Sequence, residues 1–210
     1  MVLKVVEADT SDAPRAVEVE NLAYGAIPGN IGPVLFPGPF PPDRPSRADV
    51  LTRLRSEDEG TRWAKVVDTD LEAAGADGLV AFTEWHFWTR PREQTAGVFG
   101  EGCNVEACER MFGAMRDRRQ GRFDGKPFAY LKLLHTHPDH QRRGAGGMLL
   151  EWGTQEADRL GLPAYLEATK EGKPLYEKYG FREVELLLTD FSPWGGPAEH
   201  PSSLMLREKA

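Results

Sequence analysis

The sequence has few cysteines and no long apolar segment. It contains two cysteines, Cys103 and Cys108, in 210 residues, which is too few for a disulfide framework. Their spacing matches neither a common zinc knuckle nor a redox pair, so we expect two free thiols. No apolar run approaches the ~20 residues of a membrane-spanning helix, and residues 1–7 lack the apolar segment and cleavage site of a signal peptide. These absences predict a soluble, cytoplasmic protein with no membrane partner.

An excess of positive charge is also missing. The chain has 26 Lys and Arg against 33 Asp and Glu, a net charge of -7. The average attraction to a phosphate backbone is therefore absent, and we expect no nucleic-acid partner. Internal repeats and low-complexity tracts are lacking as well. A hydrophobic content of 40% can bury one sizeable core, and length alone allows one or two domains.

Residues 128–160 carry the clearest pattern in the chain. The apolar run from Phe128 to Leu134 predicts a buried strand. The glycine-rich segment from Gln141 to Gly147 predicts a loop, and a helix is expected to open directly after it. Residues on one face of that helix share apolar or small character, as expected for a core-facing stripe: Leu149, Leu150, Gly153, Ala157 and Leu160. The predicted order is strand, basic glycine loop, helix.

This order suits a phosphate ligand. The first turn of a helix has N–H groups without intrahelical partners, and the helix dipole is positive there. Glycines allow the backbone to approach a phosphate closely, and Arg142 and Arg143 add positive charge. Gly144, Gly146 and Gly147 match neither the Walker pattern nor the dinucleotide fingerprint. We therefore expect a pyrophosphate of another kind.

Four motifs resemble the GNAT superfamily, the Gcn5-related N-acetyltransferases. Gln141-x-x-Gly144-x-Gly146 resembles its acetyl-CoA-binding segment, and Thr136-x-Pro138 the motif before it. Tyr165–Thr169 resembles its fifth strand, and Leu175–Phe181 its closing motif. The resemblance implies one α/β domain over residues 1–210, with a mixed, mostly antiparallel sheet flanked by helices and splayed fourth and fifth strands. Strands are predicted at residues 3–8, 62–67, 78–88, 128–134, 165–169, 181–189 and 204–207.

The resemblance also implies an activity and a cofactor site. The activity is transfer of an acetyl group from acetyl-CoA, as co-substrate, to a primary amine by direct attack in a ternary complex. Backbone groups near the end of the fourth strand would hold pantetheine and polarise the thioester, and the loop would hold the pyrophosphate. The implied cofactor-binding residues are Leu134, His135, Thr136, Gln141, Arg142, Arg143, Gly144, Ala145, Gly146 and Gly147. Tyr176 matches the family tyrosine that protonates the CoA thiolate.

The general base is less clear in the sequence. Many GNAT members carry Glu or His on the fourth strand, where this chain has Tyr130. A tyrosine does not readily accept a proton at neutral pH, so Tyr130 is expected to orient the amine instead. Glu84, Glu167 or a water chain could serve as base, and Glu84 is our first choice.

Two other functions remain open. His135, His137, Asp139 and His140 resemble zinc ligands of the metallo-β-lactamase superfamily, which would suit a zinc-dependent hydrolase. That fold needs further downstream histidines, and only His200 follows in the sequence. We therefore predict no metal. A noncatalytic acyl-CoA-binding module would keep the glycine loop without turnover.

Two segments bear on the acceptor. The Pro- and Gly-rich residues 27–45 predict an irregular loop that either packs on the body or shapes the acceptor pocket. Residues 89–127 read as a helical insertion, with an apolar pattern at Cys108, Met111, Phe112 and Met115. That insertion is a surface helix, a lid or a subunit contact, and we expect a monomer or homodimer. Aromatic residues at 85, 87 and 88 suggest a small amine with apolar parts.

Overall fold

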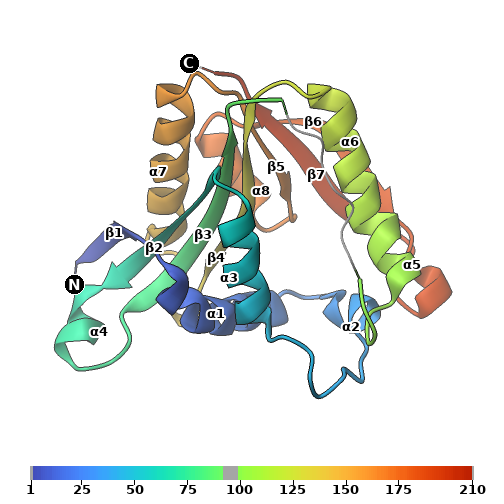
Figure 1. The fold of residues 1–210 in the computed structure, drawn as a ribbon, viewed down its shortest axis with the longest axis horizontal. Coiled ribbons are helices and arrows are strands. Elements are labelled where there is room, and N and C mark those ends of the chain that lie inside the picture. The colour runs from blue at the N-terminus through green and yellow to red at the C-terminus, as the bar shows by residue number, and fades with distance from the viewer. Residues whose placement is uncertain (1, 92–98, 210) are drawn as a thin grey trace.

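The computed structural model describes residues 2–91 and 99–209. Residues 92–98 of the expected insertion lie outside the described residues. Within these ranges the chain forms one seven-stranded sheet, seen edge-on between helices in Figure 1. Its strands are β1 (Leu3–Glu7), β2 (Thr61–Asp68), β3 (Leu79–Trp88), β4 (Phe128–Thr136), β5 (Ala164–Ala168), β6 (Arg182–Thr189) and β7 (His200–Arg207).

The sheet is mixed and mostly antiparallel, as predicted. Its strand order is β1-β2-β3-β4-β5-β7-β6, and β4 with β5 forms the parallel pair. A parallel pair needs a crossover connection, and the predicted helix after the glycine loop, α7 (Ala145–Arg159), provides it. Every strand that we predicted is present, and β7 begins earlier than expected.

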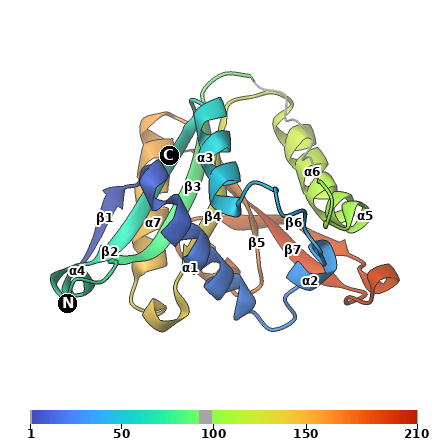
Figure 2. The same cartoon turned by 60° about the horizontal axis from the view of Figure 1, so that its bottom comes forward.

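The long helices cover the two faces of the sheet. On one face, α1 (Ala13–Gly25) and α3 (Arg47–Glu57) pack over β2, β3 and β4. The other face carries α7 and the short helix α8 (Lys173–Lys178). Figure 2 shows α1 and α3 in front of the strands with α7 behind them. The described residues outside the insertion also form short helical segments: α2 (Gly32–Leu35), α4 (Thr69–Ala73) and the 3-10 turns Thr10–Asp12, Pro138–His140 and Ser192–Trp194.

The parallel strands β4 and β5 separate part of the way along. They pair at three positions and no further, ending at Leu131 and Leu166. A bulge in β4 lies at the same level, because Glu84 of β3 pairs with Leu133 while Trp85 pairs with Leu131. A bulge bends its strand and increases its twist. Beyond Leu131, β4 therefore stays paired with β3 alone, and the strands splay as the family resemblance implied.

The insertion between β3 and β4 is helical, as predicted. It consists of α5 (Val105–Cys108), a π turn at Glu109–Gly113 and α6 (Ala114–Phe123). Phe123 packs on Phe128, Tyr165, Leu187 and Leu204, so α6 covers the β5–β7–β6 half of the face that carries α1 and α3. One residue of the expected apolar pattern, Phe112 in the π turn, is exposed, whereas its neighbour Met111 is buried.

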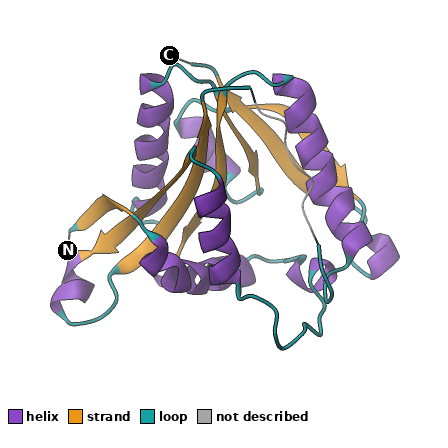
Figure 3. Ribbon diagram, in the orientation of Figure 1, coloured by secondary structure: helices purple, strands orange, loops and turns teal. Residues whose placement is uncertain are grey.

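The irregular segment 27–45 packs against this insertion. Its single helical turn, α2, was not predicted, and its Ile31 and Leu35 form one apolar cluster with Cys108 and Met111. The backbone carbonyl of Leu35 accepts a hydrogen bond from the Asn104 N–H at 2.9 Å. Figure 3 shows this long connection, drawn as loop around a short helix, reaching the insertion. Segment 27–45 and the insertion thus pack together as one unit.

Candidate active site

The glycine loop ends in an uncapped helix. Gly144 is the N-cap residue of α7, has a φ of +91° and gives no side-chain cap. The first intrahelical bond runs from the Met148 N–H to the Gly144 carbonyl at 3.0 Å. The N–H groups of the preceding first turn, residues 145–147, therefore point out of the helix end, where the dipole is positive. The loop has the backbone geometry of an anion site.

Two further glycines make room around that helix end. A Cβ at Gly147 would lie 2.6 Å from the Tyr179 hydroxyl oxygen, and one at Gly146 would lie 3.3 Å from a methyl carbon of Leu175. Tyr179 and Leu175 belong to the closing motif, so only glycine lets this segment approach the start of α7 so closely. The closing motif therefore packs directly against the start of α7, and this close contact needs glycine at position 147 and favours it at position 146.

The two arginines of the loop lie in different surroundings. Arg142 is exposed and has a φ of +62°. The Arg143 guanidinium lies 2.7 Å from Asp68 of β2 and 2.6 Å from Nδ1 of His140. Its charge is therefore largely balanced within the protein, and Arg142 provides the exposed positive charge. Gln141 donates a side-chain hydrogen bond to the Thr136 carbonyl at 3.2 Å, which ties the loop to the end of β4.

The main chain of β4 offers donors on its open side. The Leu133 carbonyl accepts from the Thr83 hydroxyl at 2.8 Å, and the His137 N–H donates to Val80, both on β3. Because successive backbone groups of a strand alternate in direction, the N–H groups of Leu134 and Thr136 face the side from which β5 has splayed. These groups lie where the sequence predicted pantetheine contacts.

Tyr176 lies on α8, next to the splayed strands. It is buried in the apolar cluster that includes Leu131, Leu166 and Ala168, and its ring meets Phe181 edge-on at 6.2 Å. A Schellman cap ends α8, because the Phe181 N–H binds the Tyr176 carbonyl and the Gly180 N–H binds Glu177, both at 3.2 Å. Burial raises the pKa of Tyr176, so its phenol keeps its proton at neutral pH.

Glu84 belongs to a buried chain of charged groups. Its Oε1 lies 3.0 Å from both the His86 ring and the Lys132 ammonium, and the other side of the His86 ring lies 3.0 Å from Asp58. Burial raises the pKa of Glu84, but the hydrogen bond from His86 and the charge of Lys132 outweigh it and lower the pKa to about 2. Such a carboxylate is a weak proton acceptor at neutral pH.

Glu167 lies in different surroundings, on β5 one position past the end of its pairing with β4. Its Oε1 accepts from Arg119 at 2.6 Å and its Oε2 from the Tyr130 hydroxyl at 2.8 Å. Burial raises the pKa of Glu167 against the opposing charge of Arg119 and the hydrogen bond from Tyr130. A carboxylate with a raised pKa at the splay is a better candidate base than Glu84.

Three residues of this region were not identified from the sequence. Arg47 of α3 binds Glu20 of α1 at 3.2 and 3.0 Å. Burial, followed by the charge of Glu20, raises the pKa of the nearby Tyr24 phenol to about 12. The charge of Arg47 partly offsets this rise in the pKa of Tyr24. Tyr24 in turn raises the pKa of Tyr176. These residues border the site through tertiary packing alone, and no local sequence signal marks them.

The histidine segment does not converge on one point. The His135 ring is buried against α1, 3.0 Å from the Ala16 carbonyl, and burial lowers its pKa to about 4. Nδ1 of His137 instead accepts the Asp139 N–H at 3.2 Å. Across residues 2–91 and 99–209, no group of three His, Cys, Asp or Glu side chains is arranged to hold a metal ion. The zinc-dependent hydrolase alternative depended on a convergence of these side chains, and the described residues do not show it.

The aromatic residues of β3 do not face the acceptor side as suggested. Trp85 and Phe87 are buried in the cluster beneath α7, on the face opposite to Glu84 and His86. Trp85 and Phe87 are therefore core residues, since alternate strand residues point to opposite faces, and they carry no information on the acceptor. Trp88 lies on the same face as Glu84 and His86, where its indole N–H donates to Asp58 at 2.9 Å.

Comparison with known proteins agrees with this fold. Residues 102–183 match the family model described as "Acetyltransferase (GNAT) domain". The chain has the GNAT fold. It is similar to solved structures of the histone acetyltransferase HPA2 and related acetyltransferase from Corynebacterium glutamicum (TM-score 0.61, 19% identity, 100% and 98% of the two chains covered) and of ribosomal-protein-S18-alanine N-acetyltransferase from Escherichia coli (0.57, 16%, 100% and 96%).

Two further matches extend the comparison. The acetyltransferase yncA of Salmonella typhimurium, solved with its cofactor acetyl-CoA, is similar at a TM-score of 0.61 and 14% identity, covering 100% and 95% of the chains. A relative from Ajellomyces capsulatus named "Probable acyltransferase SID5" is 39% identical over 44 residues, which is 21% of this chain and 32% of the relative. The chain thus matches about a third of that relative's length. In the described ranges, no helix is long and apolar enough to cross a membrane.

Proposed function

We propose that this chain is an N-acetyltransferase that moves an acetyl group from acetyl-CoA to a primary amine of a small molecule, by direct attack in a ternary complex. The observation that carries the proposal is the uncapped, glycine-lined start of α7 beside the splay of β4 and β5. Similarity to a GNAT structure solved with acetyl-CoA supports the choice of co-substrate.

Different backbone groups would bind different parts of acetyl-CoA. First-turn N–H groups at residues 145–147, with Arg142, would hold the pyrophosphate, and the N–H groups of Leu134 and Thr136 would bind along the pantetheine. When bound there, acetyl-CoA supplies the thioester whose acyl group is transferred. The backbone near Leu134 would polarise the thioester carbonyl by hydrogen bonding.

Two side chains would carry out the proton transfers of the reaction. A carboxylate oxygen of Glu167 takes a proton from the acceptor nitrogen, and the Tyr176 hydroxyl gives one to the departing sulfur. Glu167 replaces our first choice, Glu84, because the pKa of Glu84 is lowered to about 2 by His86 and Lys132. Tyr130 donates to Glu167 and would act on the amine through that carboxylate.

The experiment that tests the proposal is calorimetric titration of chelator-treated protein with acetyl-CoA, followed by acetylation assays on a panel of small primary amines. Binding should be 1:1 and micromolar, and should be lost in Gly144→Glu, which sets a strained, negatively charged residue in the phosphate loop. Gly161→Glu is the matched control, because Gly161 also has a positive φ (+66°) and open space around its Cβ. It lies beyond the far end of α7, whose 15 residues span about 22 Å at 1.5 Å per residue.

The outcomes separate the functions. No binding by the metal-free wild-type protein would overturn the acetyl-CoA proposal. Binding without turnover of any amine would instead indicate a noncatalytic acyl-CoA module. Equal loss of binding in both glycine variants would mean that the glycine loop is not the phosphate site.

A further inference from the structure

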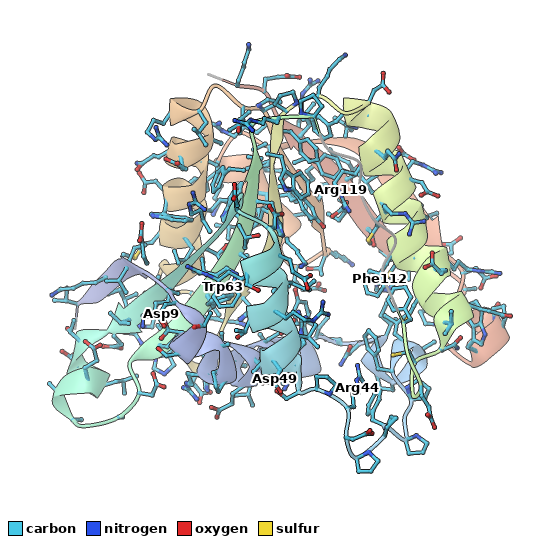
Figure 4. All side chains as sticks on the ribbon, viewed as in Figure 1. Asp9, Arg44, Asp49, Trp63, Phe112 and Arg119 are labelled. Carbon is cyan, nitrogen blue, oxygen red and sulfur yellow. The ribbon has the colours of Figure 1, made fainter. Side chains whose placement is uncertain are left out.

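One arginine of the insertion contacts the proposed base directly. Arg119 lies on the sheet-facing side of α6, as Figure 4 shows. Its Nη1 is 2.6 Å from Oε1 of Glu167, and the two side chains are 12% and 8% exposed. Their positions are 48 residues apart in the sequence. The insertion therefore supplies the cation that faces the proposed base.

Arg119 also stacks on a second residue of the site. Its guanidinium carbon lies 4.1 Å from the centre of the Tyr130 ring, while the Tyr130 hydroxyl donates to the other oxygen of Glu167 at 2.8 Å. The three side chains form a closed triangle, with each carboxylate oxygen held by a different donor. Such a carboxylate can neither rotate nor shift without breaking one of these contacts.

A neighbouring pair shows what an ordinary surface ion pair looks like on this helix. Arg118 lies 2.7 Å from Glu185, but these side chains are 47% and 34% exposed. An exposed pair of this kind contributes little, whereas removal of one partner from a buried pair leaves an uncompensated charge. Arg119 and Arg118 thus provide a buried and an exposed arginine at adjacent positions.

We propose that Arg119 is a positioning residue for the transfer reaction, which fixes the Glu167 carboxylate at the splay so that its remaining lone pairs face the acceptor nitrogen. The inference rests on the proposed function, in which Glu167 takes the proton. Each carboxylate oxygen accepts more than one hydrogen bond, so both remain able to accept a proton from the amine while Arg119 and Tyr130 hold them. The insertion then completes the site, and its helix is part of the catalytic apparatus.

The charge of Arg119 sets how readily Glu167 takes that proton. The groups facing Glu167 are Arg119 from α6, Tyr130 from β4 and Tyr165 from its own strand; Leu204 is its apolar partner on β7. Arg119 is the cation that lowers the pKa of Glu167 against burial. Replacing it with a neutral side chain should raise the pKa of Glu167 further.

The test compares Arg119→Gln, Arg119→Lys and the control Arg118→Gln. The pKa of Glu167 is measured without co-substrate by NMR of ¹³C-carboxyl-labelled glutamate, with the resonance assigned by its loss in Glu167→Gln. The acid limb of the pH profile of kcat/KM is measured on the same proteins. In Arg119→Gln both should move to higher pH, and kcat should fall about tenfold to a hundredfold with an unchanged KM for acetyl-CoA. Arg119→Lys should restore part of each change, and Arg118→Gln should match the wild type.

Each outcome has a definite meaning. A Glu167 pKa that stays or falls in folded Arg119→Gln would overturn the inference, as would equal kinetics of Arg119→Gln and Arg118→Gln. If Arg119→Gln does not fold, Arg119→Lys carries the comparison, because it keeps the charge and removes the planar guanidinium that stacks on the Tyr130 ring. Wild-type protein that never acetylates an amine would refute the proposed function, while the NMR titration would still decide whether Arg119 controls Glu167.

Discussion

Replacement of Glu84 by Gln tests whether the most buried acid of the site is structural. Glu84 is 1% exposed, and its Oε1 is shared by the Lys132 ammonium and the His86 ring. Gln keeps the shape and removes the charge, so Lys132 and His86 lose their common anion. Breaking one side of a buried charged pair typically costs about 3–5 kcal/mol. Because the amide of Gln keeps some hydrogen bonding, we expect a loss near the lower end.

The lowered pKa of Glu84 gives a similar loss in the free energy of unfolding and predicts how that loss depends on pH. Its folded pKa of about 2 lies below the ordinary value of 4.5, and this separation corresponds to on the order of 3 kcal/mol. Because the folded pKa is the lower one, this stabilisation is fully present above pH 4.5. It is lost as the pH falls from there towards 2. The difference between wild type and variant should therefore shrink in acid.

The assay is urea unfolding of both proteins between pH 7 and pH 3. The exposed control Glu57→Gln removes a pair with Arg53 whose side chains are 54% and 59% exposed, and it should cost less than about 0.5 kcal/mol. A difference between wild type and Glu84→Gln that stays constant down to pH 3 would refute the reasoning. In acetylation assays, loss of the acid limb of kcat/KM in folded Glu84→Gln would return the role of base to Glu84.

Two further predictions concern packing and acid catalysis. A Cβ at Gly153 would lie 2.5 Å from Cζ2 of Trp85 and closer still to two other ring atoms, so Gly153→Ala should lower the free energy of unfolding by about 1–3 kcal/mol. Gly121→Ala on α6, where a Cβ meets nothing within 4 Å, should raise the free energy of unfolding by about 0.5–1 kcal/mol. Thermal unfolding in which both variants change stability in the same direction would contradict these two predictions. Tyr176→Phe should lower kcat at least tenfold while calorimetry shows unchanged acetyl-CoA affinity; undiminished turnover would remove Tyr176 as the acid.

Local sequence patterns were enough for the strands and for the backbone of the glycine loop. The apolar run at Phe128–Leu134, the glycines of the loop and the Gly180–Phe181 helix end each constrain their own backbone within a few residues. The structure places the strand and the glycine loop as predicted, and Gly180 and Phe181 form the cap of α8. Ser46 similarly caps α3 through reciprocal hydrogen bonds with Asp49. Such features depend on neighbours in the chain, so they are readable without the fold.

The acceptor side could not be obtained in this way. The sequence ranked Glu84 above Glu167, but it held no information on which cations would face each carboxylate. Lys132 faces Glu84 because a bulge in β4 places it there, and Arg119 faces Glu167 because α6 packs across β5 and β7. Burial and charge then move the two pKa values in opposite directions.

The sequence by itself therefore determined the order of strands and helices, the glycine loop and the helix end that follows it, since these are set by backbone conformation and short-range periodicity. The tertiary structure alone decided which ionisable groups meet across the face of the sheet. An electrostatic environment depends on side chains tens of residues apart, such as Arg119 and Glu167, and on the water that their packing excludes. That environment distinguishes the candidate base from a structural carboxylate.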